Sequence, residues 1–208
     1  SDENASIAIK YDWKTAFGEI PSGVTLMAYG SDGTTLQNIS NNTSSMPLNL
    51  EVGTWKILSF NLTTSEFTSF AFSKMTSYDS AQVKLNNIES GTYTNGTWDK
   101  GVVYQQQPED LAVTTDTINV TEDMIYGSKG FNTTGTDSTT KTYVIKETPK
   151  PVNTQLTIRI RVYNISSINN SIGSITGLAG GYLLTKRHAS TDKATFLLQN
   201  FKATVDST

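Results

Sequence analysis

Residues able to do acid–base or metal chemistry are sparse in this chain of 208 residues. The one histidine, His188, lies in a polar K-R-H-A-S loop, with no second histidine or carboxylate at metal-ligand spacing beside it. No serine occupies the G-x-S-x-G frame of a nucleophile elbow. The chain has no cysteine, which excludes disulfide frameworks, thiol nucleophiles and cysteine-bound zinc. We therefore expect His188 to be an exposed loop residue, and we expect no metal site, no cofactor and no enzymatic activity.

Two pairs of neighbouring carboxylates could serve hydrolysis or calcium binding, namely Glu109-Asp110 and Glu122-Asp123. A glycosidase needs two carboxylates on facing elements, about 5 to 10 Å apart, and a linear sequence does not place them there. A calcium loop of the D-x-[DN]-x-[DN]-G kind is missing from the sequence. We interpret both pairs as solvated charges in turns.

Glycines gather late in the chain, where a phosphate-binding loop is the functional alternative to a turn. These glycines are Gly173, Gly177, Gly180 and Gly181. They follow an isoleucine-rich segment rather than a strand-to-helix turn, and neither G-K-[ST] nor G-x-G-x-x-G occurs among them. We therefore expect them to permit a tight turn and not to bind phosphate.

Aromatic residues are the remaining candidates for ligand binding, because three tryptophans and nine tyrosines could build a platform for sugar rings. Trp55 lies in a strand with a core pattern and is expected to be buried. Trp98, in the sequence T-W-D-K-G, is the tryptophan that we expect at the surface. Two interpretations of Trp98 stay open, a small apolar cluster under a long loop and a sugar-binding site.

The overall composition is typical of a secreted or surface β-protein. Thr, Ser, Asn and Gly are abundant, 36% of the residues are hydrophobic and only 17% are charged. No stretch approaches the roughly 18 apolar residues of a membrane span, and no signal peptide is recognisable. A small basic part without a clustered stripe argues against binding of nucleic acid.

The stretch Met46–Leu62 predicts a central hairpin with a tight turn at Glu51-Val52-Gly53. Trp55 and Ile57 point to one face, whereas Leu58, Phe60 and Leu62 point to the other, because strand side chains alternate with period two. Apolar groups on both faces indicate an interior strand. Further strands are predicted at 7–13, 24–29, 67–73, 83–85, 111–120 and 142–147, and Glu122–Gly127 is expected to be a short turn.

A joint at Pro149-Lys150-Pro151 predicts the boundary between two β-sandwich domains, residues 1–148 and 152–208. Proline fixes φ and withholds an N–H donor, so the preceding strand should end there. The charge changes sign at the same place. Residues 1–150 hold 10 lysines and 17 acidic residues, a net charge of −7, whereas residues 151–208 hold 6 basic and 2 acidic residues, a net charge of +4.

The run Thr154–Asn164 shows the most regular β pattern in the chain, and we expect it to be a strand with one buried face. The edge that it would present carries Thr154, Leu156, Ile158, Ile160 and Val162. Two more strands are expected at 182–186 and 195–205. A small sandwich takes about 80 to 100 residues, but only 58 follow Lys150. We therefore expect either that the chain continues beyond Thr208 or that the first domain or a partner supplies a strand to this edge by β-augmentation.

Three pieces of residues 6–62 carry a family resemblance: Y-D-W, then P-S-G-V-T-L-M-A-Y-G-S-D-G, then L-E-V-G-T-W-K-I-L-S-F-N. In order and spacing they resemble the fimbrillin-type (FimB-like) fimbrial anchor lipoprotein family of Gram-negative gut and oral anaerobes, and above all a related domain of unknown function. The resemblance implies an all-β fold of two tandem transthyretin-like Greek-key β-sandwich domains, the second incomplete here. It also implies an outer-membrane location behind a lipidated N-terminal cysteine, which this sequence does not contain.

The expected function is that of a non-enzymatic cell-surface structural protein, a fimbria-associated anchor or accessory subunit. Its partners would be other fimbrial or surface subunits, joined by β-strand pairing. The alternative is a glycan-binding module of a surface nutrient-capture system. Exposed coplanar aromatics around Trp98 would favour the sugar, and an aromatic-free surface would favour assembly. In bacteria that carry the resembling family, a Ser or Thr that follows Asp and precedes a small or apolar residue can accept an O-glycan. Ser138, Ser80 and Thr117 are therefore candidate acceptors, and chance matches in a Thr-rich chain are the alternative.

Overall fold

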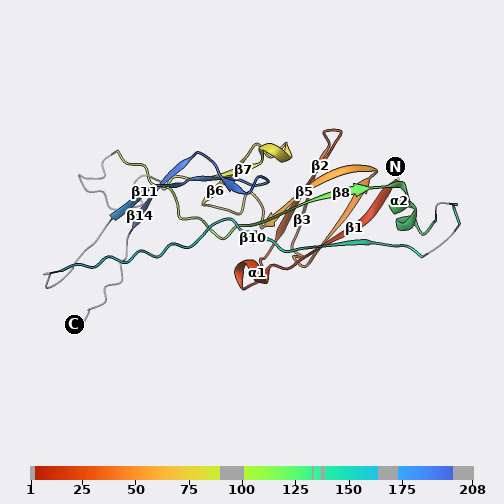
Figure 1. Ribbon diagram of the computed structural model, residues 1–208, viewed down its shortest axis with the longest axis horizontal. Coiled ribbons are helices and arrows are strands. Elements are labelled where there is room, and N and C mark those ends of the chain that lie inside the picture. Colours follow the sequence, from red (N-terminus) through yellow and green to blue (C-terminus); the bar gives the residue numbers. More distant parts are fainter. Residues whose placement is uncertain (1–2, 90–100, 133, 137–138, 164–172, 199–208) are drawn as a thin grey trace.

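The computed structural model describes residues 3–89, 101–132, 134–136, 139–163 and 173–198. It is an elongated assembly of β-sheets, as Figure 1 shows, with a sandwich at one end and a two-stranded ribbon at the other. The described helices are short: α1 (Lys14–Phe17), α2 (Glu122–Lys129) and the 3-10 turn η1 (Tyr78–Ser80). The expected all-β fold class is confirmed.

Sheet A has three strands, in the order β4-β1-β9. The strands are β4 (Ser45–Glu51), β1 (Asn4–Tyr11) and β9 (Tyr143–Glu147). The first two pair antiparallel, whereas β9 lies parallel to β1, with Ile7 opposite Tyr143. Sheet A therefore joins the beginning of the chain to a strand more than a hundred residues later.

Sheet B is the central sheet, in the order β10-β8-β5-β2-β3, and its neighbours all pair antiparallel. The strands are β10 (Lys150–Pro151), β8 (Ala112–Val120), β5 (Gly53–Asn61), β2 (Val24–Gly30) and β3 (Thr35–Ser40). The chain crosses from sheet A to sheet B at the Pro149-Lys150-Pro151 joint, where β9 ends and β10 begins. As predicted, the prolines end a strand.

Sheet C has four short strands, in the order β13-β12-β7-β6, and a separate ribbon pairs β11 with β14. The strands are β13 (His188–Ala189), β12 (Gly181–Leu183), β7 (Gln82–Leu85), β6 (Phe70–Ser73), β11 (Gly173–Ala179) and β14 (Lys193–Leu198). Sheet C thus takes strands from both sides of the proline joint. The boundary between residues 1–148 and 152–208 stays a prediction.

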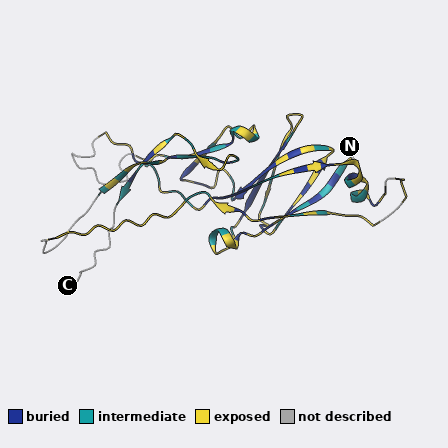
Figure 2. Ribbon diagram, viewed as in Figure 1, coloured by how far each residue is buried: buried dark blue, intermediate teal, exposed yellow. Residues whose placement is uncertain are grey.

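Two hydrophobic cores lie on opposite faces of sheet B. Trp55 and Ile57 of β5 pack into the core shared with sheet A, and Leu58 and Phe60 pack into the core shared with sheet C and the ribbon. Figure 2 shows buried positions concentrated along these strands. The predicted two-faced burial of the central strand is confirmed, because β5 lies between two strands of its sheet and between two apolar layers. The predicted hairpin is wrong, because the turn at Glu51-Val52-Gly53 carries the chain from β4 in sheet A to β5 in sheet B, and β4 pairs with β1 instead.

Buried polar groups occur where sheet A meets sheet B. The hydroxyl of Tyr11 donates to Ser59 Oγ at 2.7 Å, which satisfies both groups. The Glu147 side chain is only 7% exposed, and neither of its carboxylate oxygens has a hydrogen-bond partner among the described residues. Burial raises the pKa of Glu147 to about 7, and the neighbouring Asp116 carboxyl adds to the rise. This carboxyl is therefore a weak point of an otherwise apolar interface.

The prediction of a strand with a buried face at Thr154–Asn164 is wrong for the residues described. Residues 154–163, here called the extended segment, belong to no sheet of the described chain, and every one of them is exposed. Figure 1 draws the segment as a plain trace that runs away from sheet B. Its alternating pattern suits a strand, but no described strand lies beside it to pair its backbone or cover its apolar side.

The short turn predicted at Glu122–Gly127 is also wrong, since these residues lie in α2. Thr121 caps this helix, with its hydroxyl accepting from Met124 N at 3.3 Å, and Glu122 and Asp123 fall in the first turn, where acidic side chains favour the helix dipole. Strand β3 was missed because Thr35–Ser40 has only a weak apolar alternation, and its side chains are half-buried or exposed.

Candidate functional surface

The outer face of sheet C carries a polar hollow of about 520 Å³, here called the sheet C hollow. Strand alternation makes this face: Val83 and Leu85 of β7 turn into the core, so Gln82 and Lys84 turn outward. The lining residues are Ser73, Lys74, Gln82, Lys84, Leu183, His188, Ala189, Ser190, Thr191 and Asp192. The surface is therefore rich in hydrogen-bonding and charged groups, and its described lining residues include no Phe, Tyr or Trp.

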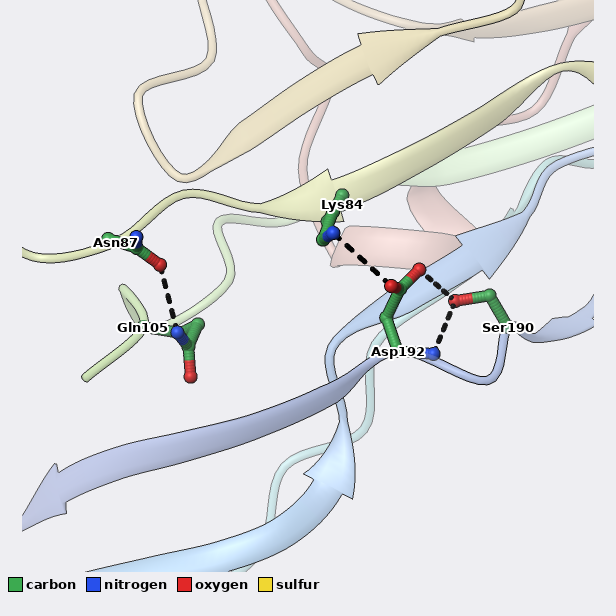
Figure 3. Close-up of polar contacts among 5 residues, drawn as sticks. All are labelled: Lys84, Asn87, Gln105, Ser190 and Asp192. Carbon is green, nitrogen blue, oxygen red and sulfur yellow. Dashed lines mark hydrogen bonds and ion pairs between the residues drawn. The ribbon is translucent and has the colours of Figure 1, made fainter. Parts of the chain in front are cut away.

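Asp192 is the most constrained charged group of the hollow. Figure 3 shows Lys84 and Ser190 pointing toward its carboxylate, with Lys84 Nζ 3.3 Å from Oδ1 and Ser190 Oγ donating to Oδ2 at 2.8 Å. The backbone N–H of Asp192 donates to Ser190 Oγ at 3.3 Å. The hydrogen bond from Ser190, then Lys84 and the positive charge of Lys74, lower the pKa of Asp192. This carboxylate therefore stays ionised and fixed in orientation.

A second polar link, also visible in Figure 3, joins sheet C to the β11–β14 ribbon. Gln105 Nε2 donates to Asn87 Oδ1 at 2.9 Å, next to the end of β7. The same Gln105 side chain accepts from Thr195 N at 2.7 Å, and the Gln105 backbone N–H donates to Thr195 O at 2.9 Å. One glutamine therefore holds β14 in place beside the strand that lines the hollow.

Two glycines allow the chain to turn from the ribbon into sheet C beside the hollow. A Cβ at Gly180 would lie 2.7 Å from Lys193 O, and a Cβ at Gly181 would collide with Ser190 Oγ. Gly177, with φ +81°, sits at the bulge between Thr176 and Leu178 of β11. Gly177 thus permits the bulge, and Gly180 and Gly181 permit the turn into sheet C, in agreement with the expectation that the glycines permit a tight turn.

The acidic pairs singled out in the sequence do not come together. Glu109 Oε1 accepts from the backbone N–H groups of Thr68 and Ser69, both at 2.7 Å, and from the Ser69 hydroxyl at 2.8 Å. Partial burial opposes ionisation of Glu109, but these hydrogen bonds outweigh it and lower its pKa. Glu122 and Asp123 are exposed on α2. Within the described residues, no three His, Cys, Asp or Glu side chains form a metal-binding group.

The structure also shows the exposure or the contacts of most of the other residues singled out in the sequence. His188 is exposed, as expected, and forms part of the hollow from β13, with Nδ1 3.0 Å from Ala189 O. Trp55 is buried, as expected. Ser80 donates its hydroxyl to Lys74 O at 2.8 Å, and Thr117 is exposed on β8. Two of the predicted residues, Trp98 and Ser138, lie outside the described residues.

The extended segment is the second candidate surface. The apolar side of its alternation is open to solvent: Leu156 is 63% exposed, Ile160 is 66% exposed and Val162 is 51% exposed. These residues belong to the edge predicted from the sequence to accept a strand, and that role remains a prediction. Sequence reasoning missed the hollow, because its residues come from strands that meet only through the long-range pairing of β7 with β12.

The stacked sheets define a β-sandwich protein whose fold is shared with solved bacterial structures. A candidate adhesin from Bacteroides ovatus matches with a TM-score of 0.61 and 15% identity, over 99% of this chain and 70% of that chain. Candidate polysaccharide binding proteins (DUF1812) from Bacteroides thetaiotaomicron match with a TM-score of 0.53 and 12% identity, over 94% and 64%. The fimbrial anchor protein Mfa2 from Porphyromonas gingivalis gives a TM-score of 0.46 at 10% identity, over 97% and 75%.

The chain belongs to the family described as Domain of unknown function (DUF5119), which matches residues 2–199. The predicted resemblance to a domain of unknown function is thereby confirmed. No curated protein matches the chain. None of the described helices is long and apolar enough to cross a membrane.

Proposed function

We propose that this protein is a non-enzymatic structural component of the bacterial cell surface, a fimbria-associated anchor or accessory subunit. The observation that carries the proposal is the exposed apolar side of the extended segment, where Leu156, Ile158 and Ile160 are 39 to 66% exposed. The names of proteins with the same fold, among them candidate adhesins of Bacteroides, support a role at the surface. Attachment to the outer membrane through an N-terminal lipid is part of the same proposal.

Strand pairing is the physical basis of the proposed assembly. The extended segment lies outside every described sheet, so a partner strand can pair with it while it covers Leu156, Ile158 and Ile160. The polar side of the segment carries Arg159, whereas residues 1–150 have a net charge of −7. We therefore propose as the partner an edge strand of a neighbouring fimbrial subunit that has a similarly acidic sandwich.

Amide hydrogen exchange tests this pairing directly. The purified chain is compared alone and after mixing with a candidate fimbrial subunit from the same organism. We expect amides of 154–160 to exchange rapidly in the chain alone and to become protected about 100-fold or more in the mixture. Ile160→Lys should abolish the protection and Thr157→Lys, on the polar side, should largely keep it. Protection of these amides in the isolated monomer, or no protection in the mixture, would contradict the proposal.

Binding of a glycan in a surface nutrient-capture system is the second candidate function, and the sheet C hollow favours it. The hollow combines charged and hydroxyl side chains within a concave surface of about 520 Å³, inside the range of known ligand sites, about 300 to 1,000 Å³. The description of one structural neighbour as a candidate polysaccharide binding protein supports this alternative. A gene neighbourhood of glycan-uptake proteins would favour glycan binding, and one of fimbrial proteins would favour assembly.

A further inference from the structure

The sheet C hollow contains one more positive than negative charge from its lysines and its aspartate. Lys84 is paired with Asp192 at 3.3 Å, while Lys74 makes no ion pair with any described residue. Lys74 is nevertheless close enough for its charge to lower the pKa of Asp192. The ammonium group of Lys74 is therefore available to a ligand that brings its own negative charge.

The backbone at Lys74 is held in place and does not need to be ordered by a ligand. Lys74 has φ +54°, a left-handed conformation that non-glycine residues rarely adopt. Its carbonyl oxygen accepts from Ser80 Oγ at 2.8 Å, which anchors the loop to η1. Strain of this kind persists where the surroundings fix the backbone, and it occurs often at binding sites.

Hydrogen-bonding groups surround the free charge on the same surface. Gln82 offers an amide, Thr191 offers a hydroxyl, and the ion-paired Asp192 offers carboxylate oxygens in the lining of the hollow. Sugars carry many hydroxyl groups that donate and accept, so this set of groups suits them better than it suits an apolar ligand. The lining residues include no Phe, Tyr or Trp, so recognition rests on charge and hydrogen bonds.

We propose that the sheet C hollow binds an acidic glycan, with a uronic acid carboxylate on Lys74 and neighbouring hydroxyls on Gln82, Thr191 and Asp192. The proposal rests on glycan binding, the second of the two proposed functions. One surplus charge matches one carboxylate, and a charge-assisted contact contributes more than a neutral hydrogen bond. Because recognition depends on charge without aromatic stacking, the affinity should weaken as the salt concentration rises.

Nuclear magnetic resonance titration of the ¹⁵N-labelled chain tests the site. The ligands are a tetrasaccharide of alternating glucuronic acid and N-acetylglucosamine, a galacturonic acid tetrasaccharide, and neutral chitotetraose as the control. We expect at least one acidic ligand to shift the amide signals of Lys74, Gln82 and residues 188–192, and chitotetraose to leave them in place. Lys74→Gln should weaken this binding about tenfold. Lys146→Gln makes the same change at an exposed lysine of β9 that does not line the hollow, and it should leave the affinity unchanged.

The possible results distinguish a failure of the sheet C hollow as the binding site from a failure of glycan binding as a function. Equal affinity in Lys74→Gln and Lys146→Gln, equal shifts with the neutral sugar, or shifts confined to another surface would each overturn the proposed site. Shifts at another surface would still support glycan binding by the chain. An absence of shifts with all three sugars would count against both the site and glycan binding, while the assembly proposal would still be decided by hydrogen exchange.

Discussion

The central strand β5 and the extended segment both carry apolar residues at every second position, with opposite results. Trp55 and Ile57 recur in this way in β5, as Ile158 and Ile160 do in the segment, yet Ile57 is completely buried and Ile160 is 66% exposed. The difference lies in their neighbours, because β5 pairs with β2 and β8, whereas the extended segment pairs with no described strand. Alternation thus specifies which side of a strand can be apolar, and the surrounding sheets decide whether that side is buried.

The largest effect is expected in β5, at the buried end of this comparison. Ile57→Asp places a charge without a partner in the core between sheets A and B, which costs several kcal/mol and should unfold the sandwich. Lys56→Asp, one residue away on an exposed position, should be mild. It loses the contact of Lys56 Nζ over the Tyr78 ring at 5.1 Å, worth about 0.5 to 1 kcal/mol. Equal thermal midpoints for the two variants would show that the face assignment is wrong.

The next effect concerns the buried Glu147 carboxyl, which weakens the same sandwich as the pH rises. In the unfolded chain this group loses its proton near pH 4.5, and in the folded chain near pH 7. The folded state therefore binds more protons between these values, so stability should fall as the pH rises from 4.5 to 7 and then level off. The total loss is about 3 kcal/mol.

Glu147→Gln removes this titration and should be more stable than the parent chain at pH 8. The measurement is a pair of chemical denaturation curves for each protein, at pH 5 and pH 8. We expect the parent to lose stability between the two pH values and the variant to change much less. A variant that shows the same pH dependence as the parent would assign the effect to other groups.

A smaller effect is expected at the corner between the ribbon and sheet C. The Cβ of Gly180→Ala would meet the Lys193 carbonyl oxygen at 2.7 Å, so the backbone must shift, at about 1 to 3 kcal/mol. Gly23→Ala is the matched control, because its Cβ would find the nearest atom at 3.6 Å. Urea midpoints compare the two variants. A control as unstable as Gly180→Ala would remove the close approach as the explanation.

The smallest effect is expected in the extended segment itself, and it completes the comparison with β5. Ile160→Asp changes a residue that is 66% exposed in the chain alone. Its thermal stability should therefore stay within about 0.5 kcal/mol of the parent. A strong destabilisation in a dilute monomer would mean that the segment is already buried within its own chain, and the contrast with Ile57 would disappear.

Local pattern was sufficient where a strand is buried by its neighbours in the sheet. The strand at 111–120 and the burial of Trp55 followed from alternation and turn residues. The pattern around Gly53 gave both strands and the turn between them but not their pairing, because β4 and β5 lie in different sheets. The pattern was insufficient for β3, whose half-exposed side chains carry little apolar signal, and for α2, which depends on the Thr121 cap. The sheet C hollow could not be predicted from the sequence, because Lys84 and Asp192 come together only when β7 pairs with β12.

The parallel pairing of β1 with β9 has a consequence for how the protein forms. Ile7 and Tyr143 are register partners, so sheet A closes a loop of more than 130 residues before its last strand is in place. Closing long loops before the rewarding contacts form slows folding. During synthesis, the sandwich must also wait until residue 147 has been added. The nascent chain therefore stays without its complete fold until about 70% of its residues have been added.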